Sequence, residues 1–334
     1  PKTYTVDWDA SAAEKGGWDS FMDKEIHEDP AAVQRTLLGR FDTNGGITLD
    51  EVRIDEHDFK AIDKIIVVAC GTASYAGQVA KYAIEHWVRI PVEIELAHEF
   101  RYRDPILTPR TLVVAISQSG ETMDTLMALR HAREQGSKVL AICNTQGASI
   151  PRESDAVLYT HAGPEVAVAS TKAFVAQITA AYLLGLYLAQ VKGAMFRDEI
   201  HQMLDSLKDM PRKIQWVLDT QPKTIQAAAE RMVNANSFLF LGRHVGYPVA
   251  LEGALKLKEI AYTFTEGFAA GELKHGPIAL VDEGEPVVFI VPPQRGRNVL
   301  HAKVISGIEE VKARGAYIIA VAEQGDPDVE RYAD

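Results

Sequence analysis

The chain has 334 residues, of which 47% are hydrophobic and 24% charged, and its formal net charge is -11. This length exceeds the usual size of one hydrophobic core and predicts two domains of about 150 residues each. The 35 Lys and Arg residues are dispersed, which argues against a nucleic-acid partner because phosphate backbones require a concentrated basic patch.

The sequence also argues against a membrane or an exported protein. It contains no run of about 18 apolar residues and no signal-peptide hydrophobic region. Cys70 and Cys143 are the two cysteines, and neither belongs to a Cys/His cluster, so we expect no zinc site and a reducing cytoplasm. No Gly-x-Gly-x-x-Gly or P-loop pattern occurs, and no cofactor is indicated.

Residues 1–55 are predicted to form a short helical N-terminal extension, with helices at Trp18–His27 and Ala31–Leu38 on either side of a break at Asp29-Pro30. From 56 to 200, short β-branched runs alternate with amphipathic segments, which indicates an α/β domain with a doubly wound parallel sheet. Its expected strands are Ile65–Ala69, Val92–Leu96, Leu112–Ile116, Val139–Cys143 and Ala156–Tyr159. Helices are expected at Tyr75–Val88 and Met123–Gln135, and the run Ala173–Leu188 is apolar enough to lie between layers.

A helical linker is predicted at 201–228, with a break at Met210-Pro211, and a second doubly wound domain at 229–334. The expected order of the second domain is strand Phe238–Leu241, helix Val249–Tyr262, strand Val287–Val291, helix Asn298–Arg314 and strand Tyr317–Val321. Because few residues follow this last strand, we expect the second domain to be incomplete at its C-terminal end.

A serine-rich segment follows the predicted strand Leu112–Ile116 and precedes a predicted helix. Ser117, Gln118, Ser119 and Thr122 offer three hydroxyl groups and an amide, and Gly120 allows close approach of the backbone. Because helix N-termini present unpaired N–H groups, this segment is a candidate phosphate site that needs no basic residue. The alternative is an ordinary helix cap formed with Glu121.

Two weaker candidates have the same setting. Thr72 lies in the turn Cys70-Gly71-Thr72-Ala73-Ser74 after the first strand, and either ligand binding or a plain turn would explain it. Ser170 and Thr171 stand at the start of the long apolar helix, where capping and substrate contact are both open.

Acid and base candidates occur in the second domain. Glu252, Lys256 and Glu259 are spaced to share one helix face, and the alternative there is a solvated salt-bridge face. In Gly271-Glu272-Leu273-Lys274-His275-Gly276, glycines flank three polar residues in a predicted loop. A histidine there can exchange protons with a sugar ring oxygen, while a carboxylate moves a proton between adjacent carbons. The other histidines, such as His86, His98, His161 and His301, lack comparable polar neighbours in the sequence and are interpreted as structural.

These motifs resemble those of the glucosamine-6-phosphate synthase family, in its isomerase half with two sugar isomerase (SIS) domains. The resemblance lies in Ser-Gln-Ser-Gly-Glu-Thr at 117–122, Ala-Ser-Thr-Lys-Ala-Phe at 169–174, Leu-Glu-Gly-Ala-Leu-Lys-Leu-Lys-Glu at 251–259 and Gly-Glu-Leu-Lys-His-Gly-Pro at 271–277. It implies conversion of fructose 6-phosphate and ammonia to glucosamine 6-phosphate by a cytoplasmic homodimer with shared active sites.

The resemblance also implies roles for individual residues. Phosphate would be held by Ser117, Gln118, Ser119 and Thr122, and the sugar would be contacted by Thr72, Val168 and Ser170. Glu259, assisted by Lys256, would move the proton between C1 and C2, and His275 would open the ring in the site of the neighbouring subunit.

Three departures from the family pattern affect these expectations. No glutaminase domain is expected in this chain, which starts at Pro1, and no counterpart is seen of the family's C-terminal lysine that forms a Schiff base with the sugar. Ala73 also stands where many relatives have serine. Two other functions stay open: a sugar-phosphate-binding module without catalysis, and an amino-sugar-phosphate deaminase or deglycase.

Overall fold

The computed structural model describes residues 14–41, 46–295 and 299–334. The chain divides between Asp219 and Thr220 into two compact units, which we call unit 1 and unit 2. This division falls within the predicted linker 201–228, and the other domain boundaries stay predictions.

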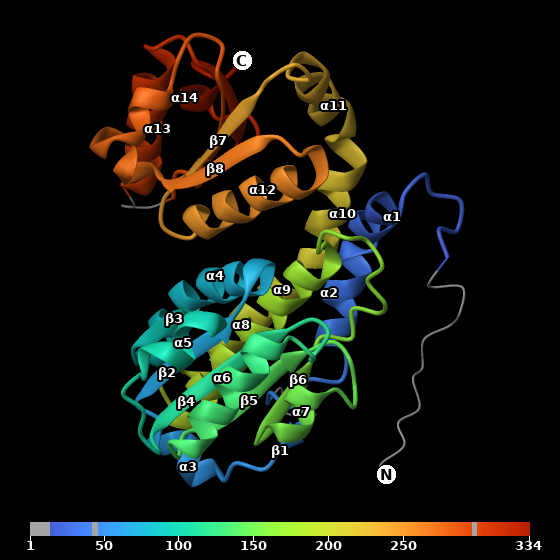
Figure 1. The fold of residues 1–334 in the computed structure, drawn as a ribbon, viewed down its shortest axis with the longest axis vertical. Helices are drawn as coiled ribbons and strands as arrows, with labels where there is room; N and C mark the ends of the chain where they lie inside the picture. The colour runs from blue at the N-terminus through green and yellow to red at the C-terminus, as the bar shows by residue number, and fades with distance from the viewer. Residues whose placement is uncertain (1–13, 42–45, 296–298) are drawn as a thin grey trace. The chain divides into compact units, whose positions relative to one another are not determined.

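A six-stranded sheet forms the centre of unit 1, in the order β1-β6-β5-β4-β2-β3 (Figure 1). Its strands are β1 (Glu51–Val52), β2 (Lys64–Ala69), β3 (Val92–Leu96), β4 (Thr111–Ser117), β5 (Lys138–Cys143) and β6 (Ala156–Tyr159). Neighbouring strands are parallel except for β1, which pairs antiparallel with β6. The five predicted strands are confirmed, whereas β1 comes from a segment for which only helices were expected.

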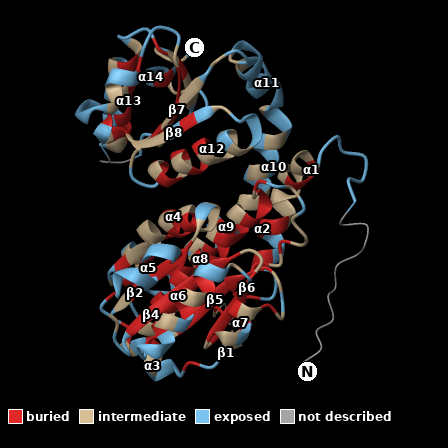
Figure 2. Ribbon diagram, viewed as in Figure 1, coloured by how far each residue is buried: buried red, intermediate tan, exposed pale blue. Residues whose placement is uncertain are grey.

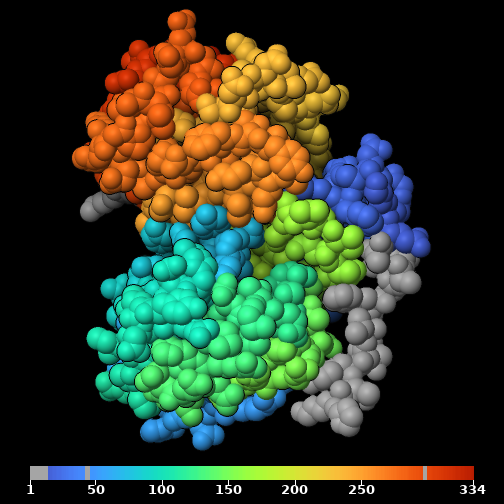
Figure 3. Space-filling view, in the orientation of Figure 1, coloured from blue at the N-terminus to red at the C-terminus, as the bar shows by residue number. Residues whose placement is uncertain are grey.

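Helices cover both faces of this sheet, so its inner strands β2, β4, β5 and β6 are mostly apolar, whereas the edge strand β3 contains Glu93 and Glu95. Because strand side chains alternate between faces, Ile65 and Val67 pack into one apolar cluster with α4 and α8, and Ile66 and Val68 into another with α5 and α6. Figure 2 shows the buried strands between these layers. In the space-filling view of Figure 3, the cyan to green atoms of unit 1 cover the strands on the face toward the viewer. The helices of unit 1 are α1 (Phe21–His27), α2 (Asp29–Leu37), α3 (Glu56–Ala61), α4 (Gly71–Val88), α5 (Ala97–Arg103), α6 (Met123–Glu134), α7 (Ser149–Glu153), α8 (Lys172–Lys192) and α9 (Arg197–Lys208).

One helix of the described residues, α8, is long and apolar enough to cross a membrane by length and composition, with a mean hydropathy of 1.5. However, 61% of its apolar window is buried inside the protein, where α8 packs along α2, α3 and α4. A helix surrounded on all sides is apolar all round. Its place in the core, as predicted for Ala173–Leu188, therefore accounts for its composition.

Unit 2 contains a four-stranded parallel sheet in the order β10-β9-β7-β8. Its elements are α11 (Pro222–Arg231), β7 (Ser237–Gly242), α12 (Gly246–Ala261), β8 (Phe264–Ala269), the 3-10 helices η2 (Ala270–His275) and η3 (Pro277–Leu280), β9 (Pro286–Ile290), α13 (Leu300–Lys312), β10 (Tyr317–Val321) and α14 (Pro327–Glu330), preceded by α10 (Met210–Thr220) at the division. On one face Phe240 packs against Gly253 of α12, and on the other Leu239 and Leu241 share a core with α13. The doubly wound fold is confirmed, although β8 was not expected and Asn298, the predicted start of α13, lies outside the described residues.

Both sheets have a topological switch point. The first parallel strand of each sheet pairs on both sides, β2 with β3 and β4, and β7 with β8 and β9. Successive connections therefore leave in opposite directions and open a crevice beyond the carboxyl ends of the strands, where open α/β sheets bind their ligands.

Candidate functional site

The segment 117–122 connects β4 to α6 at the crevice of unit 1. Ser117 Oγ lies 2.9 Å from Thr122 Oγ1 and accepts the N–H of Gly120 at 3.1 Å. Ser119 Oγ accepts the N–H of Glu121 at 3.2 Å. These short-range contacts fold the segment into a tight turn and bring its hydroxyl groups to the start of the helix.

Gly120 is required in this turn for two reasons. Its φ of +68° lies in the left-handed region that side chains disfavour, and a Cβ there would be 2.6 Å from Ala148 Cβ and 3.2 Å from Pro151 Cδ. Its carbonyl accepts the N–H of Ile150 at 3.0 Å. The turn therefore packs directly on the start of α7.

The capping alternative does not describe the start of α6. Thr122 occupies the N-cap position, but its side chain makes no cap hydrogen bond. The Glu121 carboxylate instead accepts the N–H of Ser149 at 2.6 Å. The Thr122 side chain thus does not cap the first-turn N–H groups of α6, as anion binding there would require, and the exposed Asp124 is the acidic residue of that turn.

The turn after β2 lies on the neighbouring strand of the crevice. α4 begins at Gly71, whose φ is +54°, and the N-cap residue Cys70 makes no side-chain cap hydrogen bond. Half-buried Thr72 is in the first turn of α4, and Cys70 Sγ lies 4.0 Å from Thr125 Oγ1 of α6. Ser74 is buried, and within the described residues its hydroxyl oxygen has no hydrogen-bond partner.

Asn144 joins two of these segments through hydrogen bonds, and the sequence did not predict this role. It is buried at the end of β5, and its N–H donates to the carbonyl of Gln118 at 3.1 Å. Its side chain donates to Gly163 O at 2.7 Å and accepts from Thr160 Oγ1 and the N–H of Ala162. Asn144 therefore links the segment 117–122 to the chain that leads into 165–171, and its place directly after a predicted strand was the available signal.

The segment 165–171 precedes α8. Val168 is 98% exposed and Ser170 is half-buried, with the Ser170 hydroxyl donating to Glu165 at 3.2 Å. The N-cap residue Thr171 caps no N–H of α8. Sugar contact by Val168 and Ser170 stays a prediction.

In unit 2, α12 brings together Glu252, Lys256 and Glu259 on one face, as their spacing predicts. Lys256 Nζ lies 2.7 Å from Glu259 Oε2 and 3.4 Å from Glu252 Oε1. The side chains of Lys256 and Glu252 are only 19% and 7% exposed. The alternative of a solvated salt-bridge face is therefore wrong: this is a mostly buried cluster with one partly exposed carboxylate, Glu259, at its edge.

His275 ends η2, where a loop was predicted. Leu273 is buried in the core of unit 2 and anchors this 3-10 helix, while its neighbours Lys274 and His275 are exposed. Lys274 pairs with Glu310 at 2.7 Å. Within the described residues, no hydrogen bond or ion pair joins His275 to Lys256 or Glu259.

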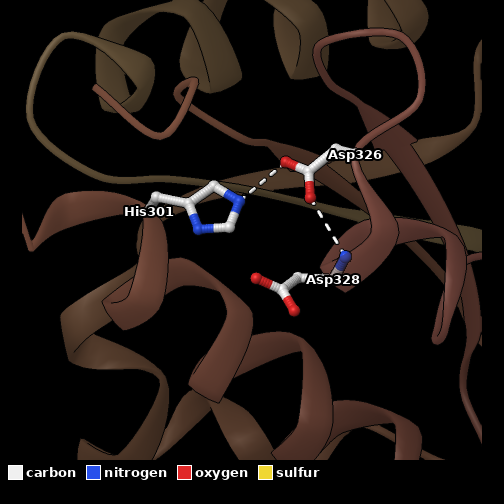
Figure 4. A group of neighbouring side chains, drawn as sticks. All are labelled: His301, Asp326 and Asp328. Atoms are coloured by element: carbon white, nitrogen blue, oxygen red, sulfur yellow. Dashed lines mark hydrogen bonds and ion pairs between the residues drawn. The ribbon is translucent and has the colours of Figure 1, made fainter. Parts of the chain in front are cut away.

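His301 has the polar neighbours that the sequence analysis did not find (Figure 4). Its Nε2 lies 2.7 Å from Asp326 Oδ2, while Asp326 Oδ1 caps α14 by accepting the N–H groups of Asp328 and Val329. Burial raises the pKa of Asp326, but these hydrogen bonds outweigh it and leave the pKa below its ordinary value. The ligand atoms of His301, Asp326 and Asp328 lie within 4.8 Å of one another, yet both Asp326 oxygens are already used, so the cluster ties α14 to α13.

Two doubly wound parallel sheets, one of them with polar turns at its switch point, define the class of this chain as an open-sheet α/β protein. The SIS domain model matches residues 59–187 and 231–334, and the chain belongs to this family. It is 69% identical over 333 residues to the glutamine--fructose-6-phosphate aminotransferase [isomerizing] of Corynebacterium diphtheriae, covering all of this chain and 53% of that protein. The chain thus spans about half the length of the curated relatives it matches, and the expected resemblance is confirmed.

Solved structures are also similar to this chain over most of its length. The C-terminal domain of glucosamine-fructose-6-phosphate aminotransferase from Francisella tularensis matches with a TM-score of 0.89 and 39% identity, covering 96% of this chain and 88% of that one. A glucosamine-6-phosphate deaminase from Thermotoga maritima matches with a TM-score of 0.67 at 21% identity, covering 92% and 86%. That second likeness concerns the fold alone.

Proposed function

We propose that the chain is the isomerase half of a glutamine--fructose-6-phosphate aminotransferase and converts fructose 6-phosphate and ammonia to glucosamine 6-phosphate and water. The similarity to the aminotransferases over the whole chain supports this assignment. The observation that carries the proposal is the start of α6, which has no side-chain cap and is surrounded by the hydroxyl groups of 117–122.

In this proposal the phosphate binds to Ser117, Gln118, Ser119 and Thr122 and to the first N–H groups of α6. Helix-end amides carry partial positive charge, so they can hold a dianion on a chain whose net charge is -11. The sugar lies against Thr72, Val168 and Ser170.

Glu259 moves a proton from C1 to C2 of the open-chain intermediate. The Lys256 ammonium at 2.7 Å places positive charge beside this carboxylate, and the partial burial of the cluster strengthens that interaction. His275 opens the sugar ring, and it does so from the neighbouring subunit of a homodimer, consistent with its exposed position.

Turnover tests the acid/base assignment. Formation of glucosamine 6-phosphate from fructose 6-phosphate and ammonia, and interconversion of fructose 6-phosphate with glucose 6-phosphate, are measured for this chain within a protein of its relatives' full length, unmodified and as Glu259→Gln. Loss of a proton-transfer group lowers the rate by about 100-fold or more. Glu266→Gln, an exposed change on β8, is the matched control and keeps full activity. Equal rates for the unmodified chain and Glu259→Gln would contradict the assignment.

A further inference from the structure

Four carboxylate side chains of unit 1 lie close together at the segment 165–171. Glu25 comes from α1, Glu28 and Asp29 from the start of α2, and Glu165 from the segment itself. Lys172 is buried and pairs with Glu28, and Lys24 lies 3.8 Å from the same residue. These charges come from segments about 140 residues apart in the sequence.

Glu25 accepts three hydrogen bonds from the segment 165–171. It is only 2% exposed, and its Oε1 accepts the N–H groups of Val166 at 2.6 Å and Ala167 at 3.0 Å. Its Oε2 accepts the hydroxyl of Thr171 at 2.9 Å. Glu25 therefore holds the segment on both sides of Val168 and Ser170.

Glu165 completes the arrangement from within the segment. Its Oε1 accepts the N–H groups of Thr171 at 2.8 Å and Ala173 at 3.1 Å, and its Oε2 accepts the Ser170 hydroxyl. Thr171 Oγ1 also lies 3.2 Å from Glu165 Oε1, so this hydroxyl lies between the two carboxylates and can donate its one proton to either.

Of the segment 165–171, Ala169 is the apolar residue that is buried, at 1% exposed, and its side chain is a single methyl group. Val168 is 98% exposed and Val166 is 44% exposed. Hydrogen bonds from N–H groups to a buried carboxylate are among the stronger kinds in proteins. The two carboxylates are therefore the main determinants of where Val168 and Ser170 lie.

We infer that Glu25 and Glu165 are positioning residues that fix the segment 166–171 for sugar binding, with Thr171 as the hydroxyl that lies between them. The inference rests on the proposed function for the identity of the ligand, and on the contacts alone for the shape of the segment. It adds a role for the N-terminal helices, which lie outside the matched SIS residues.

The test compares Thr171→Val with Thr36→Val. Thr36 is another buried threonine of unit 1, and its hydroxyl lies within hydrogen-bond distance of Ala32 O and Thr160 O. Amide hydrogen exchange over 164–173 is measured without ligand, and fructose 6-phosphate affinity by calorimetry. Thr171→Val should speed exchange in this segment and weaken affinity about tenfold, the effect of one hydrogen bond to a charged group. Thr36→Val should lower thermal stability and leave both readouts unchanged.

A second pair of variants, Glu25→Ala and Glu25→Gln, tests whether an amide can replace the Glu25 carboxylate in holding the segment. The amide keeps an oxygen for the N–H groups of Val166 and Ala167 and can donate to Thr171, so it should retain affinity within about threefold. The alanine variant should not. Unchanged exchange over 164–173 in both Thr171→Val and Glu25→Ala would overturn the inference. If the unmodified chain binds no fructose 6-phosphate, the proposed function fails, while the exchange measurement still decides the positioning role.

Discussion

Asp29 has an unusual charge environment at the start of α2. Burial, together with the nearby carboxylates Glu165, Glu25 and Glu28, raises its pKa to about 7, against the opposing effect of Lys172. One of its buried oxygens has no hydrogen-bond partner. Asp29 thus gains a proton more readily than an ordinary aspartate, and the proton limits repulsion among the carboxylates at the segment 165–171.

This shift predicts a pH-dependent effect of Asp29→Asn. A carboxyl whose pKa is higher in the folded chain than in the unfolded one destabilises the fold increasingly as pH rises from about 4 to about 7. The free energy of unfolding of Asp29→Asn should therefore exceed that of the unmodified chain, by a margin that grows by about 2 kcal/mol between pH 5.5 and pH 8.

Urea unfolding at the two pH values measures this margin. Asp58→Asn is the control, because Lys138 lowers the pKa of Asp58 and its replacement gives no such growth. A margin for Asp29→Asn that is constant over this range would contradict the interpretation.

At the scale of single residues, the sequence predicts those residues whose partners lie only a few positions away along the chain. Ser117, Ser119 and Thr122 lie within six residues between a strand and a helix, and Lys256 and Glu259 share one helix face, so a short window shows both groups. Glu25 was missed because its partners Val166, Ala167 and Thr171 are 141 to 146 residues away. No periodicity within a short window can show such a contact.

The turn between β4 and α6 is the element on which the phosphate site depends. Gly120→Ala introduces a methyl group 2.6 Å from Ala148 at a left-handed φ of +68°. Backbone strain and overpacking should together cost about 3 kcal/mol of stability. Gly136→Ala is the matched control, since Gly136 has a φ of +85° but open space at the Cβ position, and it should cost only about 1 kcal/mol.

Thermal unfolding of the two variants measures the difference. Equal destabilisation by Gly120→Ala and Gly136→Ala would show that the turn is not packed tightly against the start of α7. The positive φ would then be the remaining reason for a glycine in the segment.

Among the elements, the fully buried strands were predictable and the short or half-exposed ones were not. The apolar runs of β2, β4 and β5 lie between two helical layers and stand out in the sequence. β8 contains exposed Phe264 and Glu266 and a glycine, Gly267, so it lacks that pattern. β1 has two residues and is defined by pairing with β6, and η2 depends on the burial of Leu273.

For the whole molecule, the proposed homodimer with shared sites predicts complementation between inactive variants. Glu259→Gln and His275→Ala are each expected to be inactive. After mixing under conditions that exchange subunits, half of the dimers contain one chain of each kind, and one of their two sites has both intact residues. Turnover should then return to about a quarter of the unmodified level. Recovery no greater than the sum of the two variants would place His275 and Glu259 of one chain in the same site.

The central claim is that the turn 117–122 and the start of α6 bind the phosphate group of fructose 6-phosphate. Calorimetric titration of fructose 6-phosphate into the unmodified chain, Ser119→Ala and Ser206→Ala tests it most directly, with Ser206 an exposed serine of α9. We expect binding by the unmodified chain, an unchanged affinity for Ser206→Ala and a loss of about tenfold for Ser119→Ala. Equal affinities for the unmodified chain and Ser119→Ala, or no binding by the unmodified chain, would contradict it.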